Sequence, residues 1–156
     1  MSDVYREAAS VLLLKPVGDG YQMLLLHKPR KNDAWQLPQG GKEAQENATE
    51  TALRELSEEA GITACRLIGT SKKVYQYEFP PSFRRFRPDN VCGQRIAYVF
   101  ALAEPDVVVT VDGKEVNNFL WIDVSELPRF VRRREYRDLI VALYEEALAA
   151  IASPSA

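Results

Sequence analysis

Apolar positions in the first part of the chain fall into two short runs, which predict two strands. Residues 8–14 and 21–26 are mostly apolar, and the segment 17–20 between them contains two glycines and an aspartate. Short apolar runs that are separated by turn-forming residues are typical of paired, buried strands. The same reasoning predicts three further strands, at 66–79, 95–103 and 119–124.

The clearest helix is predicted from about Ala48 to Ala60. Asn47 can cap its N-terminus, and Glu50 lies three residues on, where it can complete a reciprocal capping box. Gly61 can adopt the left-handed conformation that ends a helix. The apolar residues recur at the spacing of one helical face, which should pack on the core: Ala52, Leu53, Leu56 and Ala60.

A second helix is predicted near the C-terminus, and loops are predicted at 35–41 and 80–94, which are marked by Gly, Pro or Arg. We expect the tail 151–156 to fray. Repeats and low-complexity linkers are absent from the sequence, so we expect one mixed α/β domain over 1–156 with its core at about 5–150. The helical spacing of the second helix is carried by Tyr136, Leu139, Ile140, Leu143, Tyr144 and Ala147.

Composition and charge indicate an ordinary folded domain. The chain is 46% hydrophobic and 27% charged, and its net charge of −2 provides no general attraction to nucleic acid or anionic membranes. Cys65 and Cys92 form no CxxC pair, which fits a reducing cytosol. The first residues lack a signal-peptide pattern, and no apolar run approaches the roughly 20 residues that span a bilayer. We therefore expect a cytoplasmic protein without membrane contact.

A cluster of glutamates lies on the first predicted helix. Glu55 is three residues before Glu58 and four before Glu59, so the three carboxylates project from one helical face. Like charges at this spacing destabilise a helix by ~0.2–0.5 kcal/mol per pair, so a cation is expected to offset them. Magnesium is commonly held by carboxylates together with substrate phosphates. Arg54 can orient one carboxylate, and Glu46 can fold back toward the same helix end.

Glutamate-rich helical faces are usually solvated surface, and the residues around these glutamates decide between the two interpretations. The segment 40–62, here called the glutamate motif, resembles the Nudix box. The box reads Gly, five residues, Glu, seven residues, Arg-Glu-aliphatic, one residue, Glu-Glu, one residue, Gly-aliphatic. A chance match at one start position is on the order of 10⁻¹⁰. Its fixed positions are filled by Gly40, Glu46, Arg54, Glu55, Leu56, Glu58, Glu59, Gly61 and Ile62.

The resemblance implies an α/β/α sandwich with a mixed sheet, in which the motif forms a loop–helix–loop that binds Mg²⁺ or Mn²⁺. It also implies hydrolysis of a nucleoside diphosphate that is linked to another group. Bound cations neutralise the phosphate oxygens and lower the pKa of an attacking water, whose proton a carboxylate such as Glu58 or Glu59 takes. The resemblance makes Glu55, Glu58 and Glu59 metal ligands, Arg54 and Glu46 orienting residues, and the backbone near Gln39 and Gly40 a further ligand.

Glu115 is a candidate for an additional metal ligand or general base outside the glutamate motif. It lies six residues before Trp121 of a predicted strand, as in relatives whose extra ligand precedes that strand. The alternative interpretation is a glutamate on a loop surface. We favour the functional role, because loops between scaffold elements commonly carry catalytic groups.

Substrate preference is indicated by more local similarities. Residues 35–41, WQLPQGG, resemble the entry to the motif in the branch that contains diadenosine tetraphosphate hydrolases and bacterial RNA 5′-pyrophosphohydrolases. Residues 75–80, Gly93 with Gln94, and the basic-aromatic stretch 132–136 resemble the same branch. We expect a dinucleoside polyphosphate first and the 5′ end of RNA second. An ADP-ribose or sugar-nucleotide pyrophosphatase remains an alternative, and a non-catalytic nucleotide-binding module is a rival of another class.

Aromatic and basic residues suggest how the nucleotide binds. We expect one of Tyr75 and Tyr77 to point into the core, and the other, Tyr77 for preference, to stack on a base. Between residues 71 and 96, six basic residues are opposed by two acidic ones, which favours contacts with phosphate. A lysine that relatives carry near Ala97 is absent, although Arg95 could replace it. The candidate substrate-binding residues are Lys73, Tyr77, Arg84, Arg85, Arg87 and Gln94.

His27 is the single histidine, and nothing in the sequence places a partner near it. We expect it to be packed or solvated and not catalytic. Trp35 is expected to pack the motif loop, and Cys65 and Cys92 are expected to be inert. The oligomeric state is not indicated by the sequence.

Overall fold

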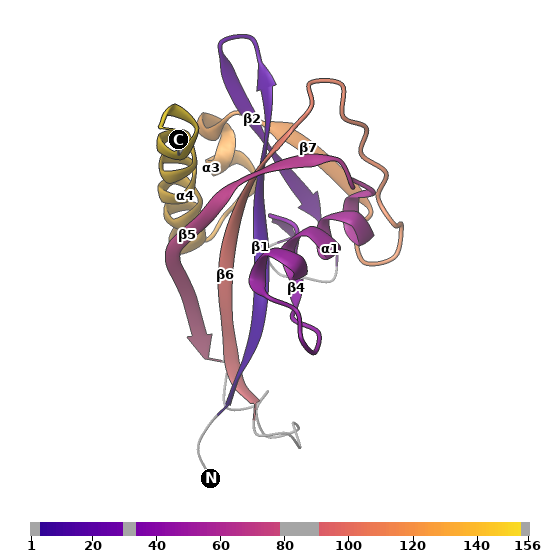
Figure 1. Ribbon diagram of the computed structural model, residues 1–156, viewed down its shortest axis with the longest axis vertical. Helices are drawn as coiled ribbons and strands as arrows, with labels where there is room; N and C mark the ends of the chain where they lie inside the picture. Colours follow the sequence, from indigo (N-terminus) through magenta and orange to yellow (C-terminus); the bar gives the residue numbers. More distant parts are fainter. Residues whose placement is uncertain (1–3, 30–33, 79–90, 154–156) are drawn as a thin grey trace.

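The computed structural model describes residues 4–29, 34–78 and 91–153. They form a seven-stranded sheet with helices on both faces (Figure 1). The strands are β1 (Val4–Val17), β2 (Gly20–His27), β3 (Trp35–Gln36), β4 (Gln39–Gly41), β5 (Cys65–Glu78), β6 (Val91–Ala103) and β7 (Asn118–Ile122).

The sheet is mixed. Its strand order is β3-β2-β1-β6-β5, with β4 also paired to β1 and β7 also paired to β2. Strands β1 and β6 run parallel to each other, and the other pairs are antiparallel. The two long parallel strands therefore form the centre of the sheet, and the segments around the glutamate motif attach to β1.

Alternate side chains of β1 enter two separate cores. Leu12 and Leu14 belong to one buried cluster, and Val11 and Leu13 belong to the other, because successive residues of a strand point to opposite faces. Helix α4 (Arg134–Ala152) covers the first face and helix α1 (Ala48–Ala60) covers the second (Figure 1). The α/β/α sandwich that the sequence predicted is confirmed, and both faces of the central strands are buried.

Helix α1 has the bounds that the sequence predicted, Ala48–Ala60. Asn47 and Glu50 form the reciprocal capping box, and Gly61 ends the helix with a φ of 67°. The buried stripe differs from the expected one, because Thr51 and Glu59 are buried and Leu53 is only half-buried.

Other boundaries differ from the expectations. The expected loop at 35–41 contains the short strands β3 and β4. Strand β7 ends at Ile122, and a 3-10 helix (Val124–Glu126) and helix α3 (Leu127–Phe130) follow it. Of the tail 151–156, which was expected to fray, Ile151 and Ala152 belong to α4 and Ile151 packs against the core. Residues 154–156 lie outside the described residues. The elements near 35–41 depend on pairing with distant strands, which local sequence does not reveal. Within the described ranges, no helix is long and apolar enough to cross a membrane.

Candidate active site

The loop that precedes α1 is fixed to strand β1 and to helix α4. The Val11 amide and the Ser10 hydroxyl both donate to the carbonyl of Pro38, at 3.1 and 2.9 Å. The Leu37 amide donates to the Tyr136 hydroxyl at 3.0 Å, and β4 pairs along β1. The loop that leads into the glutamate motif is therefore fixed by contacts with both the sheet and helix α4.

Arg54 connects the loop and the helix of the glutamate motif. Its guanidinium donates to Glu46 at 2.7 Å, to the Gly41 carbonyl at 2.8 Å, to Glu55 at 2.9 Å and to Glu58 at 3.3 Å. The hydrogen bond from Arg54 lowers the pKa of Glu46 to about 2, assisted by backbone and Thr51 hydrogen bonds. The orienting roles of Arg54 and Glu46 stay a prediction, and these contacts are the ones that such roles would need.

Glu59 forms a buried ion pair with Lys28. Lys28 Nζ lies 2.6 Å from Glu59 Oε2, and the side chains are 11% and 2% exposed. The same Nζ donates to the Gln39 carbonyl at 3.1 Å, and the Gln39 amide donates to Glu59 Oε1 at 3.0 Å. Burial raises the pKa of Glu59, and the charge of Lys28 opposes that rise. Lys28 Nζ therefore contacts both the Glu59 carboxylate and the Gln39 carbonyl, which the family resemblance assigned to a metal ion.

Glu55 lies directly against the backbone of Gly40. A Cβ atom at Gly40 would lie 2.1 Å from Glu55 Cδ, so any side chain at residue 40 would displace the carboxylate. Burial raises the pKa of Glu55, the negative charge of Glu59 raises it further, and Arg54 opposes both effects. The motif glycine is therefore required by close approach.

The donor chemistry of this cluster fits a hard divalent cation. Glu55, Glu58, Glu59 and the Gln39 carbonyl supply the oxygen atoms that Mg²⁺ and Mn²⁺ prefer. Burial raises the pKa values of Glu55 and Glu59, and the negative charge of a neighbouring glutamate adds to the rise in each case. Among the described residues, no three acidic, histidine or cysteine side chains are gathered as a ready metal cage. Lys28 and Arg54 contact these carboxylates instead.

Glu115 lines the cavity beside the glutamate motif from the loop that precedes β7. Asp112 shapes that loop by accepting hydrogen bonds from the Lys114 amide at 2.9 Å and the Val116 amide at 3.0 Å. Partial burial acts against it, but these backbone hydrogen bonds hold the pKa of Asp112 below its usual value. The negative charge of Glu115 contributes to the raised pKa of Glu59, so the two carboxylates are close enough to interact.

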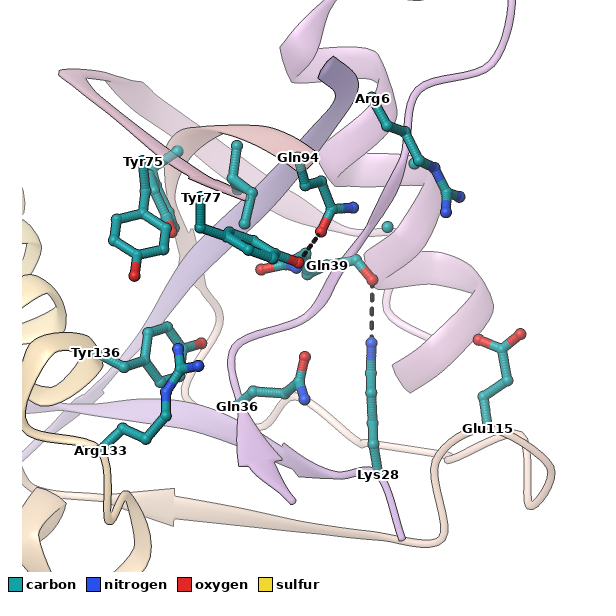
Figure 2. Close-up of a pocket in the computed structure, with 14 residues that line it drawn as sticks. Arg6, Lys28, Gln36, Gln39, Tyr75, Tyr77, Gln94, Glu115, Arg133 and Tyr136 are labelled. Atoms are coloured by element: carbon teal, nitrogen blue, oxygen red, sulfur yellow. Dashed lines mark hydrogen bonds between the residues drawn. The ribbon is translucent and has the colours of Figure 1, made fainter. Parts of the chain in front are cut away.

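A cavity of about 650 Å³ connects Glu115 and the motif loop to a group of tyrosines. At one end it is bordered by Lys28, Glu115 and the backbone of residues 39–41; at the other end lie aromatic residues (Figure 2). Arg133 and Tyr136 reach it from the α4 side (Figure 2). The lining residues are Arg6, Lys28, Gln36, Gln39, Gly40, Gly41, Tyr75, Tyr77, Gln94, Ile96, Tyr98, Glu115, Arg133 and Tyr136.

The expectation that Tyr75 and Tyr77 point to opposite faces is wrong. Both line the cavity, their ring centroids are 5.9 Å apart, and both also pack against the core under α4. Residues two apart on a strand point to the same face of the sheet, so Tyr75 and Tyr77 lie on the same side. The Tyr77 hydroxyl donates to Gln94 (Figure 2), which keeps the ring in one orientation.

A family model described as the NUDIX domain matches residues 4–143. The chain belongs to the Nudix family. It is a Nudix hydrolase, and the glutamate motif is its Nudix box. Members of this family generally use divalent metal cations, which agrees with the oxygen donors described above.

Relatives of the chain carry the name RNA pyrophosphohydrolase. One from Zymomonas mobilis is 32% identical over 92% of this chain and 92% of its own length. Another, from Marinomonas sp., is 30% identical over 89% of this chain and 92% of its own length. Together with the family, they identify the chain as a Nudix pyrophosphohydrolase.

Solved structures share the fold. The crystal structure of a C. elegans Ap4A hydrolase binary complex has a TM-score of 0.70 to this chain at 18% identity. The match covers 96% of this chain and 99% of that one. The E. coli dihydroneopterin triphosphate pyrophosphohydrolase has a TM-score of 0.68 at 21% identity, with 92% and 99% covered. At these identities the likeness concerns the Nudix fold.

The structure brings together some of the expected binding residues of this Nudix hydrolase and separates others. Tyr77 and Gln94 line the cavity, whereas Lys73 is exposed and does not line it. Arg95 is also outside the lining and contacts Gln76 and Glu7. The remaining three expected phosphate contacts, Arg84, Arg85 and Arg87, lie outside the described residues.

Sequence reasoning did not single out the charged lining residues Lys28 and Arg6. Arg6 lies against Gly41, where an added Cβ atom would come within 2.4 Å of its guanidinium. Neither residue belongs to a local motif. The pairing of β1 with β4 brings Arg6 to the cavity, and the ion pair with Glu59 places Lys28 there. Arg133 was noted only as part of the basic-aromatic stretch, and Tyr136 was noted there and as part of the apolar face of the second helix.

The remaining expectations concern packing. His27 has a partner, because its Nδ1 lies 2.7 Å from Asn117 Oδ1, and its ring lies 4.9 Å from that of Trp35. Trp35, which was expected to pack the motif loop, packs against the core under α4 and lies beside Phe130, with ring centroids 5.9 Å apart. Cys92 is buried and Cys65 is half-buried, and burial raises the pKa of the Cys65 thiol, which agrees with the inert role expected for it.

Proposed function

We propose that this Nudix pyrophosphohydrolase cleaves the 5′ polyphosphate of RNA, with Mg²⁺ as the preferred cation. The supporting observation is the continuous cavity of about 650 Å³. One end offers aromatic rings for a nucleoside, and the other is lined by Glu115 and by Gln39, Gly40 and Gly41 where the Nudix box begins. The carboxylates Glu55, Glu58 and Glu59 do not line the cavity; Glu55 lies directly behind Gly40, and Glu59 accepts a hydrogen bond from the Gln39 amide. The end of the cavity that is lined by tyrosines is called the tyrosine end below. A nucleotide whose base lies there would extend its phosphates toward Lys28 and the loop at residues 39–41.

The residues at the phosphate end divide into recognition and chemistry. Lys28 and Arg6 supply positive charge at the cavity wall, where they can contact phosphate oxygens. Glu55, Glu58, Glu59 and the Gln39 carbonyl would hold the divalent cation, which neutralises phosphate charge and lowers the pKa of a bound water. Glu58 is 57% exposed on its side chain and Glu115 faces the cavity, so either can take the proton of the attacking water.

Bond changes in this reaction are those of anhydride hydrolysis. Water adds to the α-phosphorus and gives its proton to a carboxylate, while the P–O bond from the α-phosphorus to the bridging oxygen breaks. The bridging oxygen leaves with pyrophosphate from a 5′-triphosphate, or with phosphate from a 5′-diphosphate. The RNA retains a 5′-monophosphate. Arg54 contributes by holding Glu46, Glu55 and Glu58 in one arrangement, so that the carboxylates need little reorganisation during the reaction.

RNA is placed first because relatives at 30–34% identity are named RNA pyrophosphohydrolase. A dinucleoside polyphosphate, which the sequence alone put first, is the second candidate. The local similarity at residues 35–41 and 75–80 is common to both substrate classes, and the tyrosine end of the cavity suits a nucleoside from either.

A substrate panel tests the proposal. Purified protein with MgCl₂ is incubated with 5′-triphosphorylated RNA, diadenosine tetraphosphate and ADP-ribose, and the products are separated by chromatography. We expect 5′-monophosphorylated RNA to form with the highest kcat/KM and EDTA to abolish its formation. Faster cleavage of diadenosine tetraphosphate would move the assignment to the second candidate. Cleavage of none of the three would favour the non-catalytic binding module.

A further inference from the structure

Tyr98 carries a buried hydroxyl group that has no hydrogen-bond partner within the described part of the chain. The residue is 1% exposed, and its hydroxyl oxygen is unsatisfied. Buried polar groups are nearly always hydrogen-bonded in folded proteins, so each exception needs an explanation. Burial raises the pKa of Tyr98, and the hydroxyl therefore keeps its proton and remains a donor.

The other tyrosines of the cavity use their hydroxyl groups within the protein. The Tyr136 hydroxyl accepts from the Leu37 amide at 3.0 Å, and the Tyr77 hydroxyl donates to Gln94. The Tyr75 hydroxyl lies 3.4 Å from Glu135 Oε2. These contacts fix the rings and the motif loop. Tyr98 contributes no such contact, so fixing the fold does not account for its hydroxyl.

Tyr98 reaches the cavity from strand β6. It shares a face with Ile96, two residues before it, and both line the tyrosine end. Tyr98 and Tyr136 belong to one buried cluster, Tyr75 and Tyr77 pack against it, and all four line the cavity. The hydroxyl is itself covered in this structure, so a ligand that enters between the rings would reach this donor once a ring shifts aside. Gln94 and Arg133 line the same cavity, and Tyr98 would add a third polar contact to theirs.

We propose that Tyr98 is a specificity-determining residue that donates a hydrogen bond to a ring nitrogen or carbonyl oxygen of the bound nucleobase. The inference rests on the proposed function, because it requires a nucleoside at the tyrosine end of the cavity. Aromatic stacking tolerates every base. A buried donor that only some base edges can satisfy discriminates between them, because a base without an acceptor there leaves the donor unpaired.

The substitution Tyr98→Phe separates this role from a structural one. It removes the hydroxyl and retains the ring, so the packing of β6 against α4 is preserved. If the hydroxyl serves the ligand, the variant is as stable as the wild type or more stable, because an unsatisfied buried group is lost. If an internal water or a rearranged side chain satisfies the hydroxyl, the variant is less stable and nucleotide affinity is unchanged.

Binding is measured by calorimetry with the 5′-monophosphates of adenosine, guanosine, cytidine and uridine, which contain no anhydride bond for the enzyme to hydrolyse. We expect Tyr98→Phe to weaken at least one of the four by about five- to tenfold and to narrow the differences among them. The melting temperature should not fall. Tyr144→Phe is the matched control, because Tyr144 packs against the same core but does not line the cavity; it should leave all four affinities unchanged.

Base analogues give a second test that needs no variant. In each analogue one acceptor of the preferred base, a ring nitrogen or a carbonyl, is replaced by C–H. The wild type should bind one of these analogues five- to tenfold more weakly than the preferred base. Tyr98→Phe should bind that analogue and the preferred base with equal affinity, which is the result expected for a direct interaction. Equal binding of every analogue by the wild type would overturn the inference, even if Tyr98→Phe did not fold.

Failure of this inference is distinguishable from failure of the proposed function. If the wild type cleaves triphosphorylated RNA and Tyr98→Phe binds every nucleotide like the wild type, the function stands and the role of Tyr98 is refuted. If the wild type cleaves no substrate of the panel but Tyr98→Phe weakens nucleotide binding, the role of Tyr98 stands and the proposed chemistry is refuted.

Discussion

Lys28 Nζ and Glu59 Oε2 are 2.6 Å apart in a part of the protein where both side chains are nearly inaccessible to solvent. Lys28 lies beyond the end of strand β2, and Glu59 lies in the last turn of α1. The pair therefore connects the sheet to the helix of the Nudix box. It also places an internal cation on a carboxylate that the family resemblance assigns to a divalent ion.

Removal of Lys28 should make the metal-free protein less stable. Lys28→Met retains most of the aliphatic side chain but leaves Glu59 buried without its charged partner. Breaking a buried pair from one side typically costs about 3–5 kcal/mol. We expect the free energy of unfolding in EDTA to fall by about 3 kcal/mol, as measured by urea denaturation. The second substitution Glu59→Leu should restore most of the loss, because it removes the uncompensated charge.

A divalent cation should compensate for the missing lysine. Mg²⁺ or Mn²⁺ at the motif would supply the positive charge that Glu59 lacks in Lys28→Met, so the rise in melting temperature on adding the ion should be larger in the variant than in the wild type. Lys28→Arg is the matched control, because it keeps a positive charge at the site. If the ion raises the melting temperature of Lys28→Met and of the wild type equally, Lys28 and the ion do not share Glu59.

Glu58 should matter for turnover and little for folding. Its side chain is 57% exposed, whereas that of Glu55 is 12% exposed. Glu58→Gln keeps the shape and removes a ligand charge. Because metal-assisted charge stabilisation supplies several kcal/mol of the barrier reduction, we expect kcat to fall by about 100-fold or more. Thermal unfolding should be within a few degrees of the wild type.

The matched control for Glu58 is Glu43→Gln, which removes a glutamate that also contacts Arg54, at 3.5 Å, but lies in the loop and is 67% exposed. Its kcat should remain close to that of the wild type. Turnover by Glu58→Gln near the wild-type rate would remove Glu58 from the mechanism.

Asp112 should act on turnover through Glu115. It accepts the backbone hydrogen bonds that shape the loop from Lys114 to Val116. Asp112→Ala leaves the charge of Glu115 intact but releases the loop that presents it. We expect kcat to fall by about tenfold with little change in KM. Asp112→Asn, which keeps an acceptor oxygen, should recover most of the activity.

A double-variant cycle tests whether Asp112 works through Glu115. Once Glu115→Gln has removed the carboxylate, Asp112→Ala should reduce kcat little further, because the two residues serve one function. Independent, additive losses would assign Asp112 a separate role in the stability of the loop.

Sequence alone predicted the helix of the Nudix box well because its signals are local. Asn47, Glu50 and Gly61 act within one turn of the helix ends, and the box fixes the spacing of the glutamates. The strands at 35–41 were missed because their partners are β1 and β2, which are distant in the sequence. The 3-10 helix and α3 were missed as well. The predicted strand at 119–124 ran past the end of β7 at Ile122 and into Val124, the first residue of the 3-10 helix.

The site was predicted only in part for the same reason. Arg54 and Glu46 are both inside the box, so their contact follows from it. Lys28 and Tyr98 belong to no motif, and only the packing of β2 against α1 and of β6 beside Tyr136 brings them to the cavity. The error on Tyr75 and Tyr77 was different in kind, because the two-residue period of a strand already places both on one face.

The Glu46–Arg54 contact should give the protein a component of stability that disappears in acid. The pKa of Glu46 is about 2 in the folded protein, compared with an ordinary value of 4.5. A carboxyl group whose pKa is lower in the folded state stabilises the fold fully above its unfolded pKa. That contribution is lost as the pH falls from 4.5 toward 2, because the unfolded chain binds the proton first. Glu46→Gln should therefore be less stable than the wild type near neutrality, and the two stabilities should converge in acid.

Urea denaturation of both proteins from about pH 7 down to about pH 2.5, in EDTA, measures this convergence. Glu43→Gln is the matched control. Glu43 contacts the same guanidinium but at 3.5 Å, compared with 2.7 Å for Glu46, so its stability relative to the wild type should vary little with pH. A constant gap between Glu46→Gln and the wild type across the whole range would contradict the prediction. It would mean that Glu46 supports the motif loop through its neutral hydrogen bonds to Thr51 and the Glu43 amide, and not through its charge.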